Sequence, residues 1–153
     1  MIKQRIAIAA LSLSAAGFVG IVSLEGYEPV AKPPVAGDVC TNGFGTTEGV
    51  KCGDVTNPVK AVKRAMADMA KYEGAVKRCV TVPLYQHEYD AYTSLAYNIG
   101  AGAFCSSTLV TKLNVYDYAG ACAQVLKWDK FKGKPLPGLT ARRQAEYKQC
   151  LGE

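Results

Sequence analysis

The sequence of 153 residues has little of what metal sites and nucleic-acid interfaces usually require. It contains one histidine, His87, and none of its six cysteines is spaced as a CxxC pair, so a zinc site is not indicated. It also lacks a lysine-rich tract and a stripe of interleaved basic and aromatic residues, which argues against nucleic acid as a partner. We therefore expect neither a metal ion nor a cofactor.

Acidic residues are absent from the first 24 positions, where the only charged side chains are Lys3 and Arg5. Residues 6–24 form a run of 19 uncharged residues, which as a helix would rise roughly 28 Å, close to the hydrocarbon thickness of a bilayer. Ten of the 19 are Ala, Gly or Ser, so lipid would hold this run only weakly. We expect residues 1–24 to be an uncleaved signal anchor with its basic head in the cytoplasm. A cleaved signal peptide is the alternative, since "SAAG" at 14–17 could lie near a cleavage site.

The remaining residues, 25–153, have a length typical of one domain. They carry 16 basic and 13 acidic side chains, a net charge of +3. Such mild basicity suits a polyanionic partner such as a cell wall or an acidic membrane surface. No internal repeat or low-complexity tract appears in the sequence.

Cysteines are missing before position 40, and the even set of six that follows favours disulfides in an oxidising compartment. Cys40 and Cys52 lie at the two ends of a stretch that predicts a small ribbon, which a bridge between them would stabilise. Six cysteines permit about 15 connectivities, so spacing alone does not assign the pairs. The other four are Cys79, Cys105, Cys122 and Cys150.

Turn residues and apolar periodicity predict an α+β chain that is mostly helical. Residues 26–38, "GYEPVAKPPVAGD", predict a loop, and residues 39–54 predict a hairpin or a three-stranded ribbon. Asn57 followed by Pro58 predicts the start of a helix that runs to about Cys79. A second helix is expected after Pro83, and shorter ones at about 106–113, 117–127 and 139–149.

Several stretches resemble one known family in order and spacing. They are "LEG" at 24–26, "TNGFGTTEGV" at 41–50, "NIGAGAF" at 98–104 and the run from "DYAGAC" to "EYKQC" at 117–150. Together they resemble the phage-type lysozymes of glycoside hydrolase family 24, and specifically the signal-arrest-release endolysins. The resemblance implies a lysozyme-like fold with a small N-terminal β ribbon and a helical lobe, preceded here by an apolar N-terminal helix.

The family resemblance implies an endolysin that hydrolyses the β-1,4 bond between N-acetylmuramic acid and N-acetylglucosamine in peptidoglycan, for host cell lysis and phage release. It implies a monomer tethered to the host inner membrane through residues 6–24, facing the periplasm, and then released into it. Two alternatives stay open. One is a lytic transglycosylase acting on the same bond, and the other is a membrane-tethered protein that binds cell wall without catalysis.

Two residues match the catalytic set that the family implies. Glu25 matches its glutamate and Thr41 its threonine. The chemistry needs one carboxyl that donates a proton to the glycosidic oxygen and a second group that orients or deprotonates water. The family usually has an aspartate about nine residues after the glutamate, but position 34 is Pro34. We expect Asp38 to replace it, because Asp38 lies three residues before Thr41 whereas Glu28 is only three residues after Glu25. An ordinary turn aspartate is the alternative.

The resemblance also assigns supporting residues. Asn98, Gly100, Gly102 and Phe104 would line the saccharide cleft, although a purely structural bend would explain the same stretch. Arg142 or Arg143 would hold the Glu25 carboxyl in place, with a solvated helix face as the alternative. Relatives that carry a cysteine in "GAC" tend to carry another near the C-terminus, which implies Cys122–Cys150. With Cys40–Cys52 in the ribbon, this leaves Cys79–Cys105.

Overall fold

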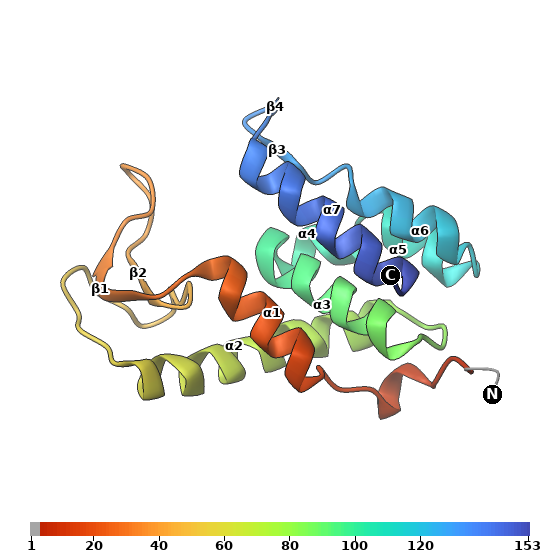
Figure 1. The fold of residues 1–153 in the computed structure, drawn as a ribbon, viewed down its shortest axis with the longest axis horizontal. Coiled ribbons are helices and arrows are strands. Elements are labelled where there is room, and N and C mark those ends of the chain that lie inside the picture. Colours follow the sequence, from red (N-terminus) through yellow and green to blue (C-terminus); the bar gives the residue numbers. More distant parts are fainter. Residues whose placement is uncertain (1–3) are drawn as a thin grey trace. The chain divides into compact units, whose positions relative to one another are not determined.

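Helices make up most of the chain in the computed structural model, which describes residues 4–153, and short strands form two small antiparallel sheets (Figure 1). The expectation of an α+β, mostly helical chain is therefore confirmed. The elements in chain order are η1 (Ile8–Ala10), α1 (Ala15–Glu25), β1 (Glu28–Lys32), β2 (Thr41–Gly43), α2 (Pro58–Cys79), α3 (Gln86–Ile99), α4 (Ala101–Cys105), α5 (Thr108–Asn114), α6 (Tyr118–Val125), β3 (Lys130–Phe131), β4 (Lys134–Pro135) and α7 (Pro137–Leu151).

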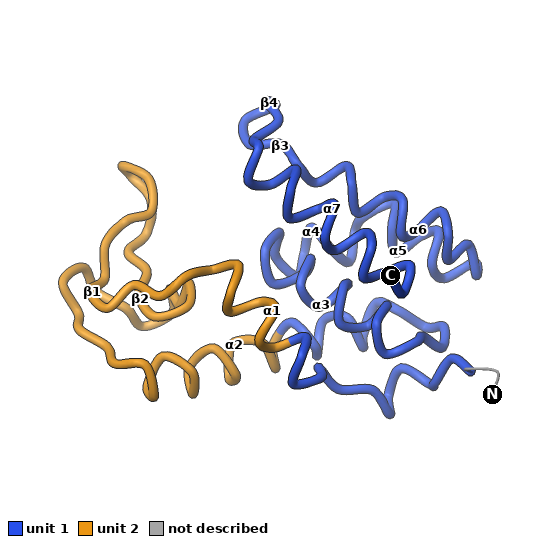
Figure 2. The backbone as a smooth tube through the Cα atoms, viewed as in Figure 1, with its two compact units in different colours: residues 1–17, 72–153 blue, residues 18–71 orange. Residues whose placement is uncertain are grey.

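The chain folds as two compact units, which Figure 2 distinguishes by colour. Residues 1–17 and 72–153 form the first, which we call the helical unit, and residues 18–71 form the second, the ribbon unit. Helices α1 and α2 each contribute residues to both. The predicted separation of residues 1–24 from residues 25–153 concerns a membrane-inserted form and stays a prediction.

The core of the helical unit is built around α3, which packs along α7. Tyr89, Tyr92 and Leu95 of this helix are fully buried, as their helical spacing predicts. Burial raises the pKa of the Tyr89 and Tyr92 phenols well above the usual value, so both stay neutral. Helix α6 packs against α5 and α7 and contributes Ala121, Cys122 and Val125 to the same core.

The ribbon unit contains a strand where the sequence predicted a loop. Strand β1 pairs antiparallel with β2, with Glu28 opposite Gly43 and Lys32 opposite Thr41. Val30 also forms a bridge to Val55. The loop prediction for residues 26–38 is thus wrong for residues 28–32. The paired prolines at 33 and 34 follow the strand instead of interrupting it, and its partners lie at least nine residues further along the chain.

Helix α2 begins as predicted. The backbone N–H of Lys60 donates to the side-chain oxygen of Asn57 at 2.9 Å, and Pro58 is the first helical residue. This cap satisfies one of the donors that a helix start leaves unpaired, while proline has no such donor to lose. The helix then runs to Cys79, the predicted end.

The N-terminal segment does not form the continuous apolar helix that was expected over residues 6–24. Ile6 pairs with Leu84 in a β-bridge, residues 8–10 form one 3-10 turn, and α1 begins only at Ala15. No helix within residues 4–153 combines the length and the apolarity needed to cross a membrane.

Carboxylates of the helical unit explain why the helix starts so late. The backbone N–H of Leu13 donates to Glu73 at 2.7 Å. The N–H and hydroxyl of Ser14 donate to the two oxygens of Asp90 at 3.0 and 2.5 Å. These bonds satisfy backbone donors that a continuous helix would have used internally, and they fix residues 13–14 against α2 and α3.

All six cysteines are paired, and the pairs are the predicted ones: Cys40–Cys52, Cys79–Cys105 and Cys122–Cys150. The last two pairs lie in the helical unit, where Cys122 and Cys150 are almost completely buried. Each bridge closes a loop and so restricts the unfolded chain.

Removal of the Cys122–Cys150 bridge should destabilise the protein. Its partners are 28 residues apart, and a loop of that length corresponds to about 3 to 4 kcal/mol in the chain-entropy estimate. The double variant Cys122→Ala, Cys150→Ala should therefore lose about that much free energy of unfolding in urea, with the wild-type protein as reference. A loss below about 1 kcal/mol would contradict this expectation.

Candidate active site

Glu25 and Thr41, the two residues matched to the catalytic set, line the same pocket of the ribbon unit. The pocket has a volume of about 410 Å³. Its other lining residues come from the start of β1, the turn after it and the strand β2: Gly26, Tyr27, Glu28, Lys32, Pro34, Gly43 and Gly45. The chain thus brings together residues that are 16 positions apart in sequence.

The end of helix α1 positions Glu25, its last residue. Gly26 follows with φ of +71°, a left-handed conformation that a residue with a side chain would adopt only under strain. The N–H of Gly26 donates to the Val22 carbonyl at 3.2 Å, which closes the helix. The half-buried Glu25 side chain therefore lies at a rigid corner between a helix and a strand.

Strand β2 positions Thr41, its first residue, directly after the Cys40–Cys52 bridge. Two residues further on, Gly43 is buried with φ of +62°, and a Cβ there would lie 3.0 Å from the Cβ of Ala61. Only glycine fits this contact between the strand and helix α2. The disulfide before Thr41 and the glycine after it fix the strand that carries the threonine hydroxyl.

Besides Glu25, the carboxylate among the residues that line the pocket is that of Glu28. Asp38 is exposed in a turn, where its N–H donates to the Val35 carbonyl at 3.0 Å, and it does not line the pocket. Glu28 does, and it pairs with Lys32 at 2.5 Å. The hydrogen bond from Lys32 holds the pKa of the Glu28 carboxyl below its usual value, so it stays ionised at neutral pH. Sequence reasoning set Glu28 aside because it lies only three residues after Glu25, whereas Asp38 lies three residues before Thr41.

Tyr27 is a pocket residue that sequence reasoning missed. Its ring packs against Phe44 with 5.6 Å between ring centroids, and its hydroxyl donates to the Thr56 carbonyl at 3.3 Å. The side chain is fixed at both ends yet partly exposed to the pocket. A tyrosine ring held in this way can stack against the apolar face of a sugar. The available signal was an aromatic residue two positions after Glu25.

The residues of "NIGAGAF" form a bend within the helical unit. Gly100, with φ of +92°, ends α3 and begins α4, as the predicted bend requires. Gly102 is exposed, and Asn98 accepts a hydrogen bond from Arg143. Phe104 is fully buried and packs into the hydrophobic core. The expectation that Phe104 contacts the saccharide is therefore wrong, because its ring has no surface left to offer.

Arg142 and Arg143 are buried residues of α7 and not a solvated helix face. Both pair with the buried carboxylate of Glu146, each at 3.1 Å. The Ser94 hydroxyl also donates to Glu146, at 2.7 Å. These contacts fix both guanidinium groups within the helical unit. Support of the Glu25 carboxyl by one of these arginines stays a prediction.

A carboxyl at a helix end, a threonine hydroxyl and an exposed tyrosine thus surround one pocket in a mainly helical α+β chain, an arrangement compatible with a glycosidase of lysozyme-like fold. The chain belongs to the phage lysozyme family, whose sequence profile matches residues 22–146.

Individual relatives agree with this assignment. The chain is 44% identical over 140 residues to an endolysin of Acyrthosiphon pisum secondary endosymbiont phage 1, covering 89% of this chain and 95% of that protein. It is 36% identical to a SAR-endolysin of Pseudomonas phage phiKMV, covering 90% and 87% of the two chains. Among solved structures, an endolysin from Escherichia coli O157:H7 phage FAHEc1 superposes with a TM-score of 0.82 at 31% identity, covering 93% of this chain and 94% of that one.

Proposed function

We propose that this protein is an endolysin that hydrolyses the β-1,4 bond between N-acetylmuramic acid and N-acetylglucosamine in peptidoglycan. The observation that carries the proposal is the shared pocket of Glu25 and Thr41 in a chain of the phage lysozyme family. Its partner is the peptidoglycan of the host, and its effect is lysis of the host cell and release of phage. It acts as a monomer without a cofactor and does not bind nucleic acid.

In the proposed reaction Glu25 is the general acid and protonates the glycosidic oxygen as the bond from that oxygen to C1 of the muramic acid breaks. The Thr41 hydroxyl orients a water molecule that adds to C1, and a new reducing end forms. The second carboxylate, which takes up the proton of this water, is one of two residues. The lining of the pocket favours Glu28, which the Lys32 contact keeps ionised, while the spacing to Thr41 favours Asp38.

Three conservative substitutions separate these roles. Thr41→Ala should lower kcat by roughly tenfold to a hundredfold, less than loss of the acid, because other groups also hold the water. Glu28→Gln should lower kcat to a similar degree, and Asp38→Asn should leave it within about threefold of wild type. Turbidity loss of purified peptidoglycan measures all three. A large loss in Asp38→Asn with an active Glu28→Gln would assign the second carboxylate to Asp38.

Product analysis tests the reaction class. A lysozyme leaves a reducing muramic acid end, whereas a lytic transglycosylase leaves a 1,6-anhydro end because the C6 hydroxyl of the sugar attacks in place of water. Mass spectrometry of digested glycan strands separates the two products by one water molecule. Detection of anhydro ends alone would replace the lysozyme proposal, and absence of any cleavage would leave the cell-wall-binding alternative.

We also propose that residues 1–24 are retained as a releasable anchor in the host inner membrane. Two observations support retention over cleavage. Residues 13–14 pack on carboxylates of the helical unit, contacts that a chain cut near residue 17 would lose. In addition, a relative that this chain largely covers carries the name SAR-endolysin. The tethered chain faces the periplasm and enters it on release. N-terminal sequencing of the soluble, active form should find the intact N-terminus.

A further inference from the structure

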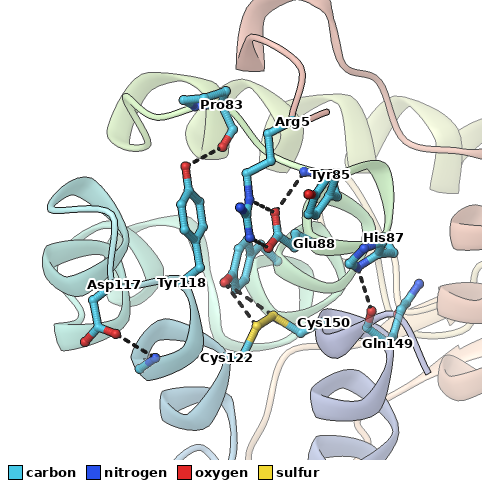
Figure 3. Close-up of polar contacts among 12 residues, drawn as sticks. Arg5, Pro83, Tyr85, His87, Glu88, Asp117, Tyr118, Cys122, Gln149 and Cys150 are labelled. Atoms are coloured by element: carbon cyan, nitrogen blue, oxygen red, sulfur yellow. Dashed lines mark hydrogen bonds and ion pairs between the residues drawn. A yellow bond between two sulfur atoms is a disulfide. The ribbon is translucent and has the colours of Figure 1, made fainter. Parts of the chain in front are cut away.

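Arg5 fills an aromatic and acidic cage in the helical unit, which Figure 3 shows in detail. Its Nε donates to one oxygen of Glu88 at 3.0 Å and its Nη2 to the other at 2.8 Å. The guanidinium carbon lies 3.5 Å from the centroid of the Tyr118 ring and 4.4 Å from that of Tyr85. The planar cation thus makes a bidentate pair with one carboxylate and contacts two aromatic rings.

The walls of this cage are held by groups other than Arg5. Glu88 also accepts the backbone N–H of Tyr85 at 2.8 Å, as part of the cap that begins α3. The Tyr118 hydroxyl donates to the Pro83 carbonyl at 3.0 Å. Only 3% of the Glu88 side chain is exposed, against 28% for Arg5. The cage is therefore a feature of α3 and α6, and the N-terminal segment inserts a side chain into it.

The same segment forms a backbone contact next to the cage. Ile6 and Leu84 exchange two hydrogen bonds, of 2.7 and 2.9 Å. Two contacts therefore fix Arg5. Its side chain pairs with Glu88, and the backbone of the next residue, Ile6, is hydrogen-bonded to Leu84. Further along, Leu13 and Ser14 bind two more carboxylates of the same unit.

We propose that this cage is a guanidinium-binding site that captures Arg5 when the N-terminal segment leaves the membrane, and that this capture draws the segment out of the lipid. The inference rests on the proposed anchor. In the tethered chain Arg5 would lie on the cytoplasmic side while Glu88 lies in the periplasm, so the pair forms only in the released chain. Any free energy that the pair contributes shifts the equilibrium towards release, because only one of the two states contains it.

The chemistry of the cage selects arginine over lysine. A guanidinium offers two parallel N–H groups to one carboxylate and a flat face to each tyrosine, whereas an ammonium is a compact charge without a plane. The bond to Glu88 also raises the pKa of Arg5 above its usual value, so the cation persists at every physiological pH. Arg5→Lys thus keeps the charge that orients the segment in the membrane and removes the geometry that the cage recognises.

The first test uses the full-length, released protein. Arg5→Lys and Glu88→Gln should each lower the melting temperature by roughly 5 °C or more, since each removes the bidentate, charge-assisted pair between the guanidinium and the carboxylate. The double variant should lose less than the sum of the two. Hydrogen exchange at the amides of Ile6 and Leu84 should accelerate in both single variants. Lys112→Ala, which breaks an exposed pair with Asp117 in the same unit, is the control and should shift the melting temperature by about 1 °C or less.

The second test measures release. Expressed with its native N-terminus, Arg5→Lys should remain in the membrane fraction longer than wild type, with the ratio of released to tethered chains lower by on the order of tenfold. Glu88→Gln should behave in the same way although its anchor is unchanged, whereas Lys112→Ala should match wild type. The soluble protein of every variant should retain its activity per folded molecule, because none of these residues lies in the active-site pocket.

Two results would overturn the inference. Unchanged melting temperature and amide protection in Arg5→Lys would show that the cage does not depend on the guanidinium. Destabilised variants that are released as fast as wild type would show that capture does not drive release. Either result is separate from a failure of the proposed function, which would appear as a wild-type protein without muramidase activity.

Discussion

Glu25→Gln is expected to abolish muramidase activity while the fold stays intact. Glutamine keeps the shape of the side chain at the corner between α1 and β1, but it cannot donate a proton to the glycosidic oxygen at neutral pH. Loss of a positioned general acid lowers rates by about 10²- to 10⁴-fold. The measurement is turbidity loss of purified peptidoglycan at equal concentrations of folded protein, with circular dichroism to verify the fold.

Glu48→Gln is the matched control for this experiment. Glu48 is an exposed carboxylate of the same ribbon unit, paired with Lys71, and it lies outside the active-site pocket. Its substitution should leave activity unchanged. Residual activity of Glu25→Gln within tenfold of wild type would show that Glu25 is not the acid, whatever the behaviour of Thr41→Ala.

Gly17→Leu is expected to trap the protein in the membrane. A Cβ at position 17 would lie 2.8 Å from the carboxyl carbon of Asp90 and 2.9 Å from a methyl group of Leu13, so in the released chain it would displace the carboxylate that binds Ser14. The same leucine makes the free energy of membrane insertion of the apolar run more favourable by about 0.5 kcal/mol. Both effects favour the tethered state, and lysis of an expressing culture should be blocked or strongly delayed.

Gly20→Leu separates the two effects. A Cβ at position 20 would have no neighbour within 4 Å, so this variant makes the apolar run more hydrophobic without the close contact that position 17 has. It should delay release only modestly, and the combination with Gly17→Leu and Ser14→Leu should have the largest effect. Membrane fractionation over time measures all variants. Release of Gly17→Leu at the wild-type rate, or a soluble form that begins near residue 17 or later, would support a cleaved signal peptide.

The sequence predicted the parts of the fold that local chemistry specifies. The Asn57–Pro58 start of α2, the bend at Gly100 and the buried tyrosines of α3 each follow from a rule that involves a few adjacent residues. The disulfide pairs and the match of Glu25 and Thr41 came from the resemblance to a family. Both residues line one pocket.

What the sequence did not predict depends on partners that are distant along the chain. Strand β1 looks like a loop until β2 and Val55 pair with it. Glu28 was set aside because it lies so close to Glu25 in sequence, and only the fold shows that it lines the pocket. Phe104 has an aromatic ring that suits a sugar, but core packing buries it. The apolar run of residues 6–24 has the length and lack of charge that predict a continuous helix in lipid. In the folded protein the helix begins only at Ala15, because carboxylates more than 50 residues away bind the backbone N–H groups of residues 13 and 14.

The contacts of Ser14 and Gly17 with Asp90 also limit how this segment can change over evolutionary time. A sequence that serves only as an anchor can exchange one small or apolar residue for another with little effect. Here positions 14 and 17 must suit both the lipid and the close approach to the Asp90 carboxylate. Few substitutions meet both requirements, so neutral drift is restricted at these two positions. Position 19, where the Val19 side chain is largely exposed, has no second requirement. Saturation mutagenesis of residues 6–24 should therefore find few tolerated substitutions at positions 14 and 17 and many at position 19. The tolerated positions should not repeat with the period of a single helix face.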